Sequence, residues 1–246
     1  GMSADMPPWA KLPDGTICMG VNRQAVDDQG APFSATGGYF LETVILRGRW
    51  RDDLSGLDWT MGETLKVPPE QSSVGCCEPA MAHLGGNRLF VTMRCQGYPD
   101  QRCPSLKFSS LSEDGGLTWA KPSPLKFDDG EIVNSPASLA QFVKFGGSDR
   151  LFWIGNISKE PVYQQIPRYP LYIVEFDPER LCLIRESMQV IDDWREGLPT
   201  DVRFTNWGSY VDRETGEIVL TLPEEPKVSW PDLTSDCYRY RLALEE

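Results

Sequence analysis

Histidine is nearly absent from this chain of 246 residues, because His83 is the single one. A Ser-His-Asp triad and a histidine-rich metal site are therefore poorly supported. No carboxylate cluster has the ligand spacing of a calcium loop. No apolar run approaches the ~20 residues that a membrane-spanning helix needs. We therefore expect no metal, no cofactor and no membrane partner.

Positive charge is also scarce. The 24 Lys and Arg residues are outnumbered by 36 Asp and Glu residues, so the net charge is −12. This balance argues against a nucleic-acid partner, since a phosphate backbone is bound by cationic surfaces. It leaves room for a small acidic ligand, because a local group of arginines can bind an anion on an acidic protein. None of these features predicts an oligomeric state.

Cysteine pairs of the CxxC kind are absent, which disfavours a zinc ribbon. The seven cysteines are odd in number and irregularly spaced, a pattern typical of reduced thiols. The alternative is a disulfide between Cys95 and Cys103, which flank a short loop, if the protein is exported. Gly1 before Met2 resembles the remnant of a tag, and no signal peptide follows. We therefore expect a cytoplasmic location.

Structure breakers, in contrast, are abundant. The chain has 20 prolines and 22 glycines, which disfavours long helices and favours many short strands joined by turns. The length suits one large all-β domain or two small ones. The composition therefore predicts an all-β fold.

The most specific motif covers residues 112–119, Ser-Glu-Asp-Gly-Gly-Leu-Thr-Trp. Its pattern Ser-x-Asp-x-Gly-x-Thr-Trp is that of an Asp-box, a β-hairpin whose turn folds back on itself. Ser and Asp side chains bond nearby backbone amides, and Gly115 and Gly116 accept positive φ. We expect Thr118 and Trp119 to begin the return strand, with the indole packed under the turn. The motif marks a fold and carries no chemistry itself.

A strand, a glycine-containing turn and a second strand recur along the chain, with a period of roughly 45–65 residues. Repeated four-stranded units favour a β-propeller over the alternative of a large β-sandwich. We therefore predict an all-β propeller of four-stranded antiparallel blades, about four in this chain, forming one domain over residues 1–246. The predicted blade units are 8–67, 78–127, 136–193 and 204–244.

The last predicted unit lacks an outer strand, and a propeller must close or expose its edges. The alternatives are a small four-bladed ring and an arc of a longer propeller, and we favour the arc.

Several short segments, taken in their order, resemble the sialidase (neuraminidase) superfamily of Asp-box propellers. These segments are Glu78-Pro79, Arg94, residues 112–119, 134–137, Asn156, residues 168–171, 206–210 and 212–218. The resemblance covers most of the chain. It implies six blades in the complete propeller and retaining cleavage of terminal sialic acids. The family uses three arginines on the sugar carboxylate, a tyrosine nucleophile polarised by a glutamate, and an aspartate as acid and base.

The chemistry explains these residue types. A planar guanidinium matches a carboxylate in bidentate fashion, so arginines suit an acidic sugar. A neutral tyrosine can attack beside the negatively charged anomeric centre, where a carboxylate would be repelled. A nearby glutamate can accept the phenol proton.

The resemblance implies catalytic roles for Tyr210, Glu78 and Asp27, with Asp27 as a loosely aligned candidate for the acid/base. For each there is a structural alternative: an aromatic packing residue, a strand-start residue and a solvated loop residue, respectively. The resemblance further implies that five residues bind substrate: Arg94, Arg168, Asn156, Asn206 and Tyr98. The alternatives here are a loop arginine, turn-forming asparagines and core aromatics, to which Trp153 and Trp207 also belong.

The chain departs from the family at its start, where the Arg-Ile-Pro motif is replaced by Asp5-Met6-Pro7-Pro8. The first arginine is absent, which weakens the expected carboxylate binding. Three hypotheses follow: a sialidase-like exo-glycoside hydrolase acting on a terminal acidic sugar, a carbohydrate-binding propeller without turnover, and a fragment whose activity needs absent blades. In each, the expected partner is a small-molecule or glycan ligand.

Overall fold

The computed structural model describes residues 2–3, 9–232 and 234–244. The segment Asp5-Met6-Pro7-Pro8, where the arginine motif is missing, lies outside the described residues. The chain forms two compact units, Gly1–Leu125 and Lys126–Glu246. Across the described ranges, we find no helix long and apolar enough to cross a membrane.

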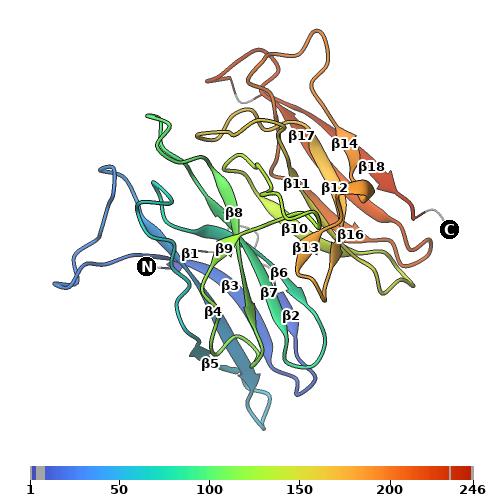
Figure 1. Cartoon of the computed structure of the whole chain (residues 1–246). Helices are drawn as coiled ribbons and strands as arrows, with labels where there is room; N and C mark the ends of the chain where they lie inside the picture. Colours follow the sequence, from blue (N-terminus) through green and yellow to red (C-terminus); the bar gives the residue numbers. More distant parts are fainter. Residues whose placement is uncertain (1, 4–8, 233, 245–246) are drawn as a thin grey trace. The chain divides into compact units, whose positions relative to one another are not determined.

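The first unit holds two antiparallel sheets (Figure 1). The strands of its first sheet are β1 (Met2–Ser3), β2 (Trp9–Lys11), β3 (Ile17–Gln24), β4 (Leu41–Trp50) and β5 (Leu57–Met61). The strands of its second sheet are β6 (Cys77–His83), β7 (Leu89–Cys95), β8 (Leu106–Ser112) and β9 (Ser123–Pro124). Successive strands pair as neighbours from β2 to β5 and from β6 to β9.

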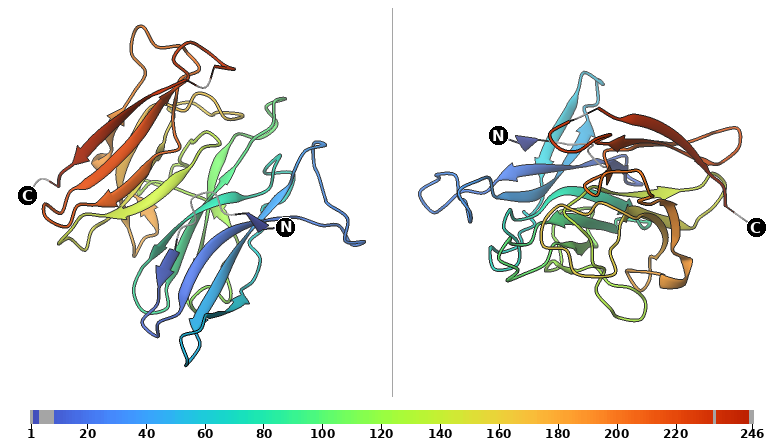
Figure 2. Two further views of the ribbon diagram at one scale, coloured as in Figure 1. Left: turned by 180° about the vertical axis from the view of Figure 1, so that it is seen from behind. Right: turned by 90° about the horizontal axis from the view of Figure 1, so that it is seen from above.

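The second unit also holds two antiparallel sheets, which Figure 2 shows from two further sides. Its first sheet consists of β10 (Ala140–Lys144), β11 (Leu151–Asn156), β12 (Leu171–Asp177), β13 (Cys182–Leu183) and β14 (Gln189–Asp192). A short 3₁₀ helix, η1 (Arg185–Ser187), precedes β14. Its second sheet consists of β15 (Arg203–Phe204), β16 (Gly208–Val211), β17 (Ile218–Glu225) and β18 (Asp236–Leu242). The four antiparallel sheets of the described residues confirm the predicted all-β fold class.

The last sheet is only three strands wide. Val219 of β17 pairs with Tyr210 of β16 on one side and with Arg241 of β18 on the other. Glu224 pairs in the same way with Phe204 of β15 and with Asp236. The strands β15 and β16 therefore share one edge of β17, and among the described residues no strand lies beyond β18. This agrees with the prediction from the sequence that the last unit lacks an outer strand.

Each unit buries its apolar residues between its own two sheets. In the first unit, side chains of β2, β3 and β4 pack against β6 and β7, with Ile45 and Leu89 fully buried. In the second unit, β10, β11 and β12 pack against β15 and β17, with Leu171 and Phe204 at the centre. Facing sheets give each unit a core of its own.

The turn at residues 112–119 has the predicted hydrogen bonds. One carboxylate oxygen of Asp114 accepts the N–H groups of Leu117 at 3.0 Å and Thr118 at 2.9 Å, and the other accepts the Thr118 hydroxyl at 2.6 Å. The Ser112 hydroxyl accepts the N–H of Gly116 at 2.8 Å. Side chains thus satisfy backbone donors that a tight turn leaves without partners.

The predicted return strand at Thr118 and Trp119 is wrong, because the next strand begins only at Ser123. At Leu117 and Trp119 the backbone bonds another segment: Leu117 O accepts the N–H of Glu63, and Trp119 N–H donates to the Glu63 carboxylate. The backbone bonds β8 again at Ala120, whose N–H donates to Leu111 O. The indole of Trp119 packs against the cores beneath the turn, as predicted.

Gly62 provides a test of the docking of the turn at residues 112–119 onto the segment around Glu63. A Cβ atom at position 62 would lie 1.8 Å from the carbonyl oxygen of Gly116, which is backbone and cannot move alone. We predict that Gly62→Ala lowers the free energy of unfolding by about 1–3 kcal/mol, the usual cost of overpacking. Gly38→Ala is the matched control, because nothing lies within 4 Å of its Cβ position. Equal urea-denaturation midpoints for the two variants would contradict the docking.

Asp114 gives the turn a pH dependence. Partial burial acts to raise the pKa of its carboxyl group, but the hydrogen bonds from Thr118, Ser112 and Leu117 outweigh burial and hold the pKa below its ordinary value. The carboxylate therefore stabilises the folded state above the unfolded-state pKa of about 3.9, and this contribution is lost as the pH falls toward the lower folded value.

We predict that Asp114→Ala costs about 1–3 kcal/mol at pH 7, since each lost hydrogen bond contributes about 0.5–1.5 kcal/mol and the bonds are not additive. The difference from the wild type should shrink between about pH 4 and pH 2, measured by urea denaturation across that range. Asp28→Ala, at an exposed loop position, should show no such change. A pH-independent cost at position 114 would rule out the carboxylate as its cause.

Candidate functional site

Glu78 and Arg94 form a largely buried ion pair in the first unit. Arg94 lies at the end of β7 and Glu78 near the start of β6, and their side chains are 10% and 14% exposed. Nη1 of Arg94 donates to Oε1 of Glu78. Oε2 of Glu78 and Nε of Arg94 are buried without a hydrogen-bond partner. The sequence-predicted arginine and glutamate are therefore brought together, each with a polar atom unused by the pair.

The backbone at Glu78 is held in an unusual conformation. Its φ is +47°, a region that non-glycine residues rarely occupy. The register between β6 and β7 shifts between Cys77 and Ala80, which is a bulge. The Glu78 N–H donates to Oδ1 of buried Asn22 at 2.9 Å, so a side chain of β3 supports the strained residue. Bulges of this kind re-aim a side chain, here toward Arg94.

The electrostatics of the pair oppose burial. Desolvation is the largest single effect and acts to lower the pKa of Arg94, but the charge and hydrogen bond of Glu78, together with smaller effects of Cys77 and Tyr39, raise the pKa overall. The guanidinium is therefore permanently charged. Burial also raises the pKa of the neighbouring Cys77 thiol to about 12, despite the charge of Arg94, so this cysteine is a neutral packing residue.

Two other predicted residues of the first unit have local structural partners. Asp27 is exposed, and its Oδ1 accepts the N–H groups of Gln29 at 2.9 Å and Ala31 at 2.8 Å, which closes a loop turn. Tyr98 is buried, and its hydroxyl donates to the carbonyl of Pro69 at 2.6 Å. The guanidinium of Arg102 covers the ring of Tyr98 at 3.4 Å from its centroid. Both arrangements correspond to the structural alternatives stated for these residues.

In the second unit, Asn156 and Arg168 are brought together in the interior. Nδ2 of Asn156 donates to the carbonyls of Arg168 at 2.9 Å and Phe204 at 3.1 Å. The Arg168 guanidinium donates to the carbonyl of Ala137 at 2.9 Å and to both oxygens of Gln165. Oδ1 of Asn156 is buried without a partner. This asparagine and arginine hold the loop before β12 against β11 and β15.

Asn206 and Tyr210 lie on the surface of the second unit. Asn206 is exposed with φ of +58°, the turn conformation that asparagine tolerates. Tyr210 lies on β16 and is 58% exposed. Trp207, between them, is buried and donates to Gln141, and Trp153 is fully buried. The two tryptophans are core residues.

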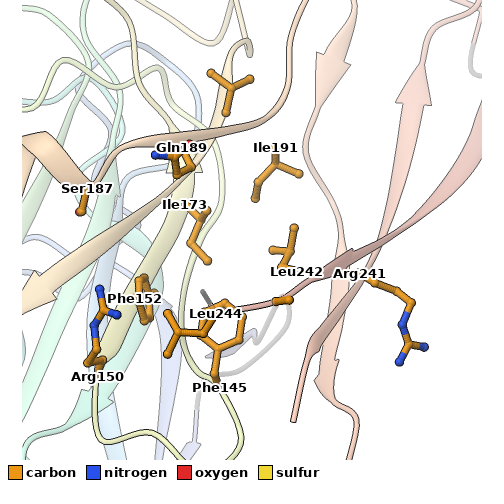
Figure 3. A pocket seen from close by; sticks show the side chains of 12 residues that line it. Phe145, Arg150, Phe152, Ile173, Ser187, Gln189, Ile191, Arg241, Leu242 and Leu244 are labelled. Carbon is orange, nitrogen blue, oxygen red and sulfur yellow. The ribbon is translucent and has the colours of Figure 1, made fainter. Parts of the chain in front are cut away.

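A cavity of about 500 Å³ in the second unit is lined by Phe152 and Ile173 of one sheet and by Leu242 and Leu244 near the end of the chain. Figure 3 shows these side chains. None of the predicted site residues lines the cavity. The Arg241 side chain points away from the apolar lining in this view and pairs with Asp212 and Glu217. Within the described part of the chain, no group of three or more His, Cys, Asp or Glu side chains is arranged to hold a metal ion.

Sequence reasoning missed Asn22, the residue that supports Glu78. Its signal was an asparagine directly after the run Ile17–Val21 in the strand Ile17–Gln24, where a buried amide needs a partner. The partner is distant in sequence, so the pattern alone identifies the requirement and leaves the bond unassigned.

No family model matches the sequence, and no curated protein matches it. Solved structures share its fold. The chain is similar to NanB with optactamide, with a TM-score of 0.56 and 14% identity over 95% of this chain and 30% of that one. It is also similar to Trypanosoma rangeli sialidase in complex with 2,3-difluorosialic acid, a covalent intermediate. Here the TM-score is 0.53 and the identity 13%, over 96% of this chain and 32% of that one.

An N-acetylgalactosamine deacetylase from F. plautii, in complex with blood group B trisaccharide, is also similar, with a TM-score of 0.52 and 12% identity over 91% of this chain and 63% of that one. The chain spans about a third of the length of the two sialidase structures. At these identities the likeness defines the fold, a sialidase-type β-propeller, and leaves the reaction open.

The buried pair predicts a strong energetic coupling. We expect Glu78→Gln to lower the free energy of unfolding by about 3–5 kcal/mol, because it leaves the Arg94 charge buried and unpaired. Removing both charges in Glu78→Gln/Arg94→Gln should recover part of this loss. Asp58→Asn is the control: its exposed pair with Arg51 should contribute about 0–1 kcal/mol. A double-mutant cycle measures the coupling, and additive single effects would exclude it.

Proposed function

We propose that this chain belongs to a sialidase-like exo-glycoside hydrolase that acts on a terminal acidic sugar. The observation that carries the proposal is the Glu78–Arg94 pair. It combines a permanently charged guanidinium with a carboxylate in a water-poor setting, and each partner keeps an unpaired polar atom. Buried charges lower the stability of the fold. Charged residues with a strained backbone and unpaired polar atoms are typical of functional sites.

In this proposal Arg94 binds the sugar carboxylate, and the phenol oxygen of Tyr210 is the nucleophile. Glu78 is proposed separately as a general base. As the bond from the phenol oxygen to the anomeric carbon forms, the glycosidic bond breaks and the leaving oxygen takes up a proton from water. A second water molecule then releases the sugar from the tyrosine. We propose further that the turn at residues 112–119 is an Asp-box at the edge of a blade and that residues 1–246 form one propeller domain. The likeness in fold to sialidases supports these assignments.

The second candidate is a carbohydrate-binding propeller without turnover. It is favoured by Arg168, whose guanidinium donates to Ala137 and Gln165. An arginine bound to carbonyls in this way positions a loop and offers less to a sugar carboxylate. Asp27, the acid/base candidate, likewise closes a turn.

Hydrolysis of aryl sialosides separates the two candidates. We expect the wild type to release the chromophore and Tyr210→Phe to lose turnover while it still binds the sugar. This substitution removes one surface oxygen, so it should leave the fold intact. Arg94→Lys should raise KM, because an ammonium cannot make the bidentate contact. Glu78→Gln should lower kcat by about 10²–10⁴-fold, the usual contribution of a general base.

Tyr238→Phe is the matched control, since Tyr238 is also exposed on a strand of the second unit. It should leave kcat and KM unchanged. Turnover that is insensitive to Tyr210→Phe would exclude this tyrosine as nucleophile. Sugar binding without chromophore release from any aryl glycoside would favour the binding protein over the hydrolase.

A further inference from the structure

Two neighbouring cavities of the second unit share one wall. The first has a volume of about 370 Å³ and the second about 260 Å³, and both are lined by Ile157, Ser158, Lys159 and Tyr172. These four residues border both cavities, and we call the two cavities together the Lys159 groove. The larger part has the volume of a small-ligand site.

The groove lies directly beside two predicted site residues. Its wall at Ile157–Lys159 follows Asn156 at the end of β11, and Tyr169 follows Arg168 before β12. The bond from Asn156 to the Arg168 carbonyl ties these two segments together beneath the groove. Asp193 and Trp194 close it from the end of β14. A buried hydrogen-bond network therefore fixes its shape.

Three aromatic side chains line the larger part: Tyr169, Tyr172 and Trp194. None is a fully buried core residue, and Trp194 is 40% exposed. Trp194 Nε1 donates to the carbonyl of Leu198 at 3.2 Å, and the Tyr169 hydroxyl donates to Thr200. Because these two polar groups are hydrogen-bonded to the backbone, the rings of Trp194 and Tyr169 are held in place. Fixed aromatic faces pack against flat, amphipathic partners such as a sugar ring.

The charges of the groove differ in how far they are already paired. In the smaller part, Arg185 is held by Asp129 and Glu131 and lies over the ring of Phe127. Lys159 is exposed, and its ammonium has no ion pair among the described residues. It is therefore the cation of the groove that is available to an anionic ligand.

Asp193 supplies the opposite charge. Its Oδ1 accepts the Trp194 N–H at 2.7 Å. Asp193 lines the larger part together with Tyr172, and burial and then the charge of Asp193 raise the pKa of the Tyr172 phenol. A carboxylate at the edge of an aromatic surface accepts hydrogen bonds from the hydroxyl groups of a sugar.

We propose that the Lys159 groove is a binding site for an acidic oligosaccharide, with one sugar ring stacked on Tyr169, Tyr172 and Trp194 and a carboxylate of the saccharide at Lys159. The inference rests on the carbohydrate-binding part of the proposed function. It is independent of Tyr210 and of turnover. In this inference the groove distinguishes acidic from neutral oligosaccharides.

The test is isothermal titration of the full chain, carrying Tyr210→Phe so that no ligand is consumed. The probes are 3′-sialyllactose and a galacturonic acid trimer, each compared with its neutral counterpart, lactose or a galactose trimer. We expect both acidic probes to bind more tightly than the neutral ones. Trp194→Ala should weaken binding of the acidic probes by about tenfold or more, a free-energy change of about 1.4 kcal/mol.

Lys159→Gln should reduce the affinity for the acidic probes to that for the neutral ones, and Lys159→Arg should restore it. The controls are Lys144→Gln and Trp230→Ala, both exposed in the same unit and outside the groove, and neither should change binding. The inference is overturned if no acidic probe binds, or if Trp194→Ala and Lys159→Gln leave the affinities unchanged.

The two proposals fail in different ways. Binding that depends on Trp194 and Lys159, together with no aryl-sialoside turnover by the wild type, would refute the hydrolase proposal and support the groove proposal. Turnover that depends on Tyr210, with oligosaccharide affinities unaffected by Trp194→Ala and Lys159→Gln, would refute the groove proposal and support the hydrolase proposal.

Discussion

One strand of each unit is buried on both faces, and this constraint organises the unit around it. All seven residues of β7 and all six of β11 are buried. These strands therefore cannot belong to a single sheet that has one solvent-exposed face. Each needs a second sheet on one side and its own loops on the other. The apolar runs Leu89–Met93 and Leu151–Ile154 therefore require stacked, repeated units, and the polar residues at the ends of these strands, Arg94 and Asn156, are drawn inside with them.

Much of this architecture is predictable because its causes are local. Alternating strands and glycine turns specify hairpins within a few residues, and the described residues form four antiparallel sheets, as the predicted all-β fold class requires. The predicted strand at Thr118 fails because Glu63, distant in sequence, competes for the backbone there. Glu78 and Arg94 are predicted as partners, but the bulge and the Asn22 bond that hold them depend on tertiary packing.

Arginine shows why the remainder of the site is beyond sequence reasoning. Arg94 and Arg168 are both buried and both match motif positions, yet one pairs with a carboxylate and the other with carbonyls and an amide oxygen. A guanidinium paired with a carboxylate forms a locally neutral pair, whereas guanidinium bonds to carbonyl groups organise a loop. The difference lies in which groups the fold brings to the guanidinium, and no spacing in the sequence encodes it.

The net charge of −12 bears on how an acidic sugar would be bound. Long-range repulsion is screened within about 8–10 Å at physiological salt, so a ligand in contact with the protein responds mainly to nearby charges. Arg94 is paired with Glu78 and would add specificity through geometry in the proposed function, while exposed Lys159 would act on an approaching anion in the proposed groove. Low salt would strengthen the attraction to Lys159 but also the repulsion from the whole molecule. The two effects oppose each other, so the affinity of the groove for an acidic saccharide should depend only weakly on salt compared with that of a basic protein.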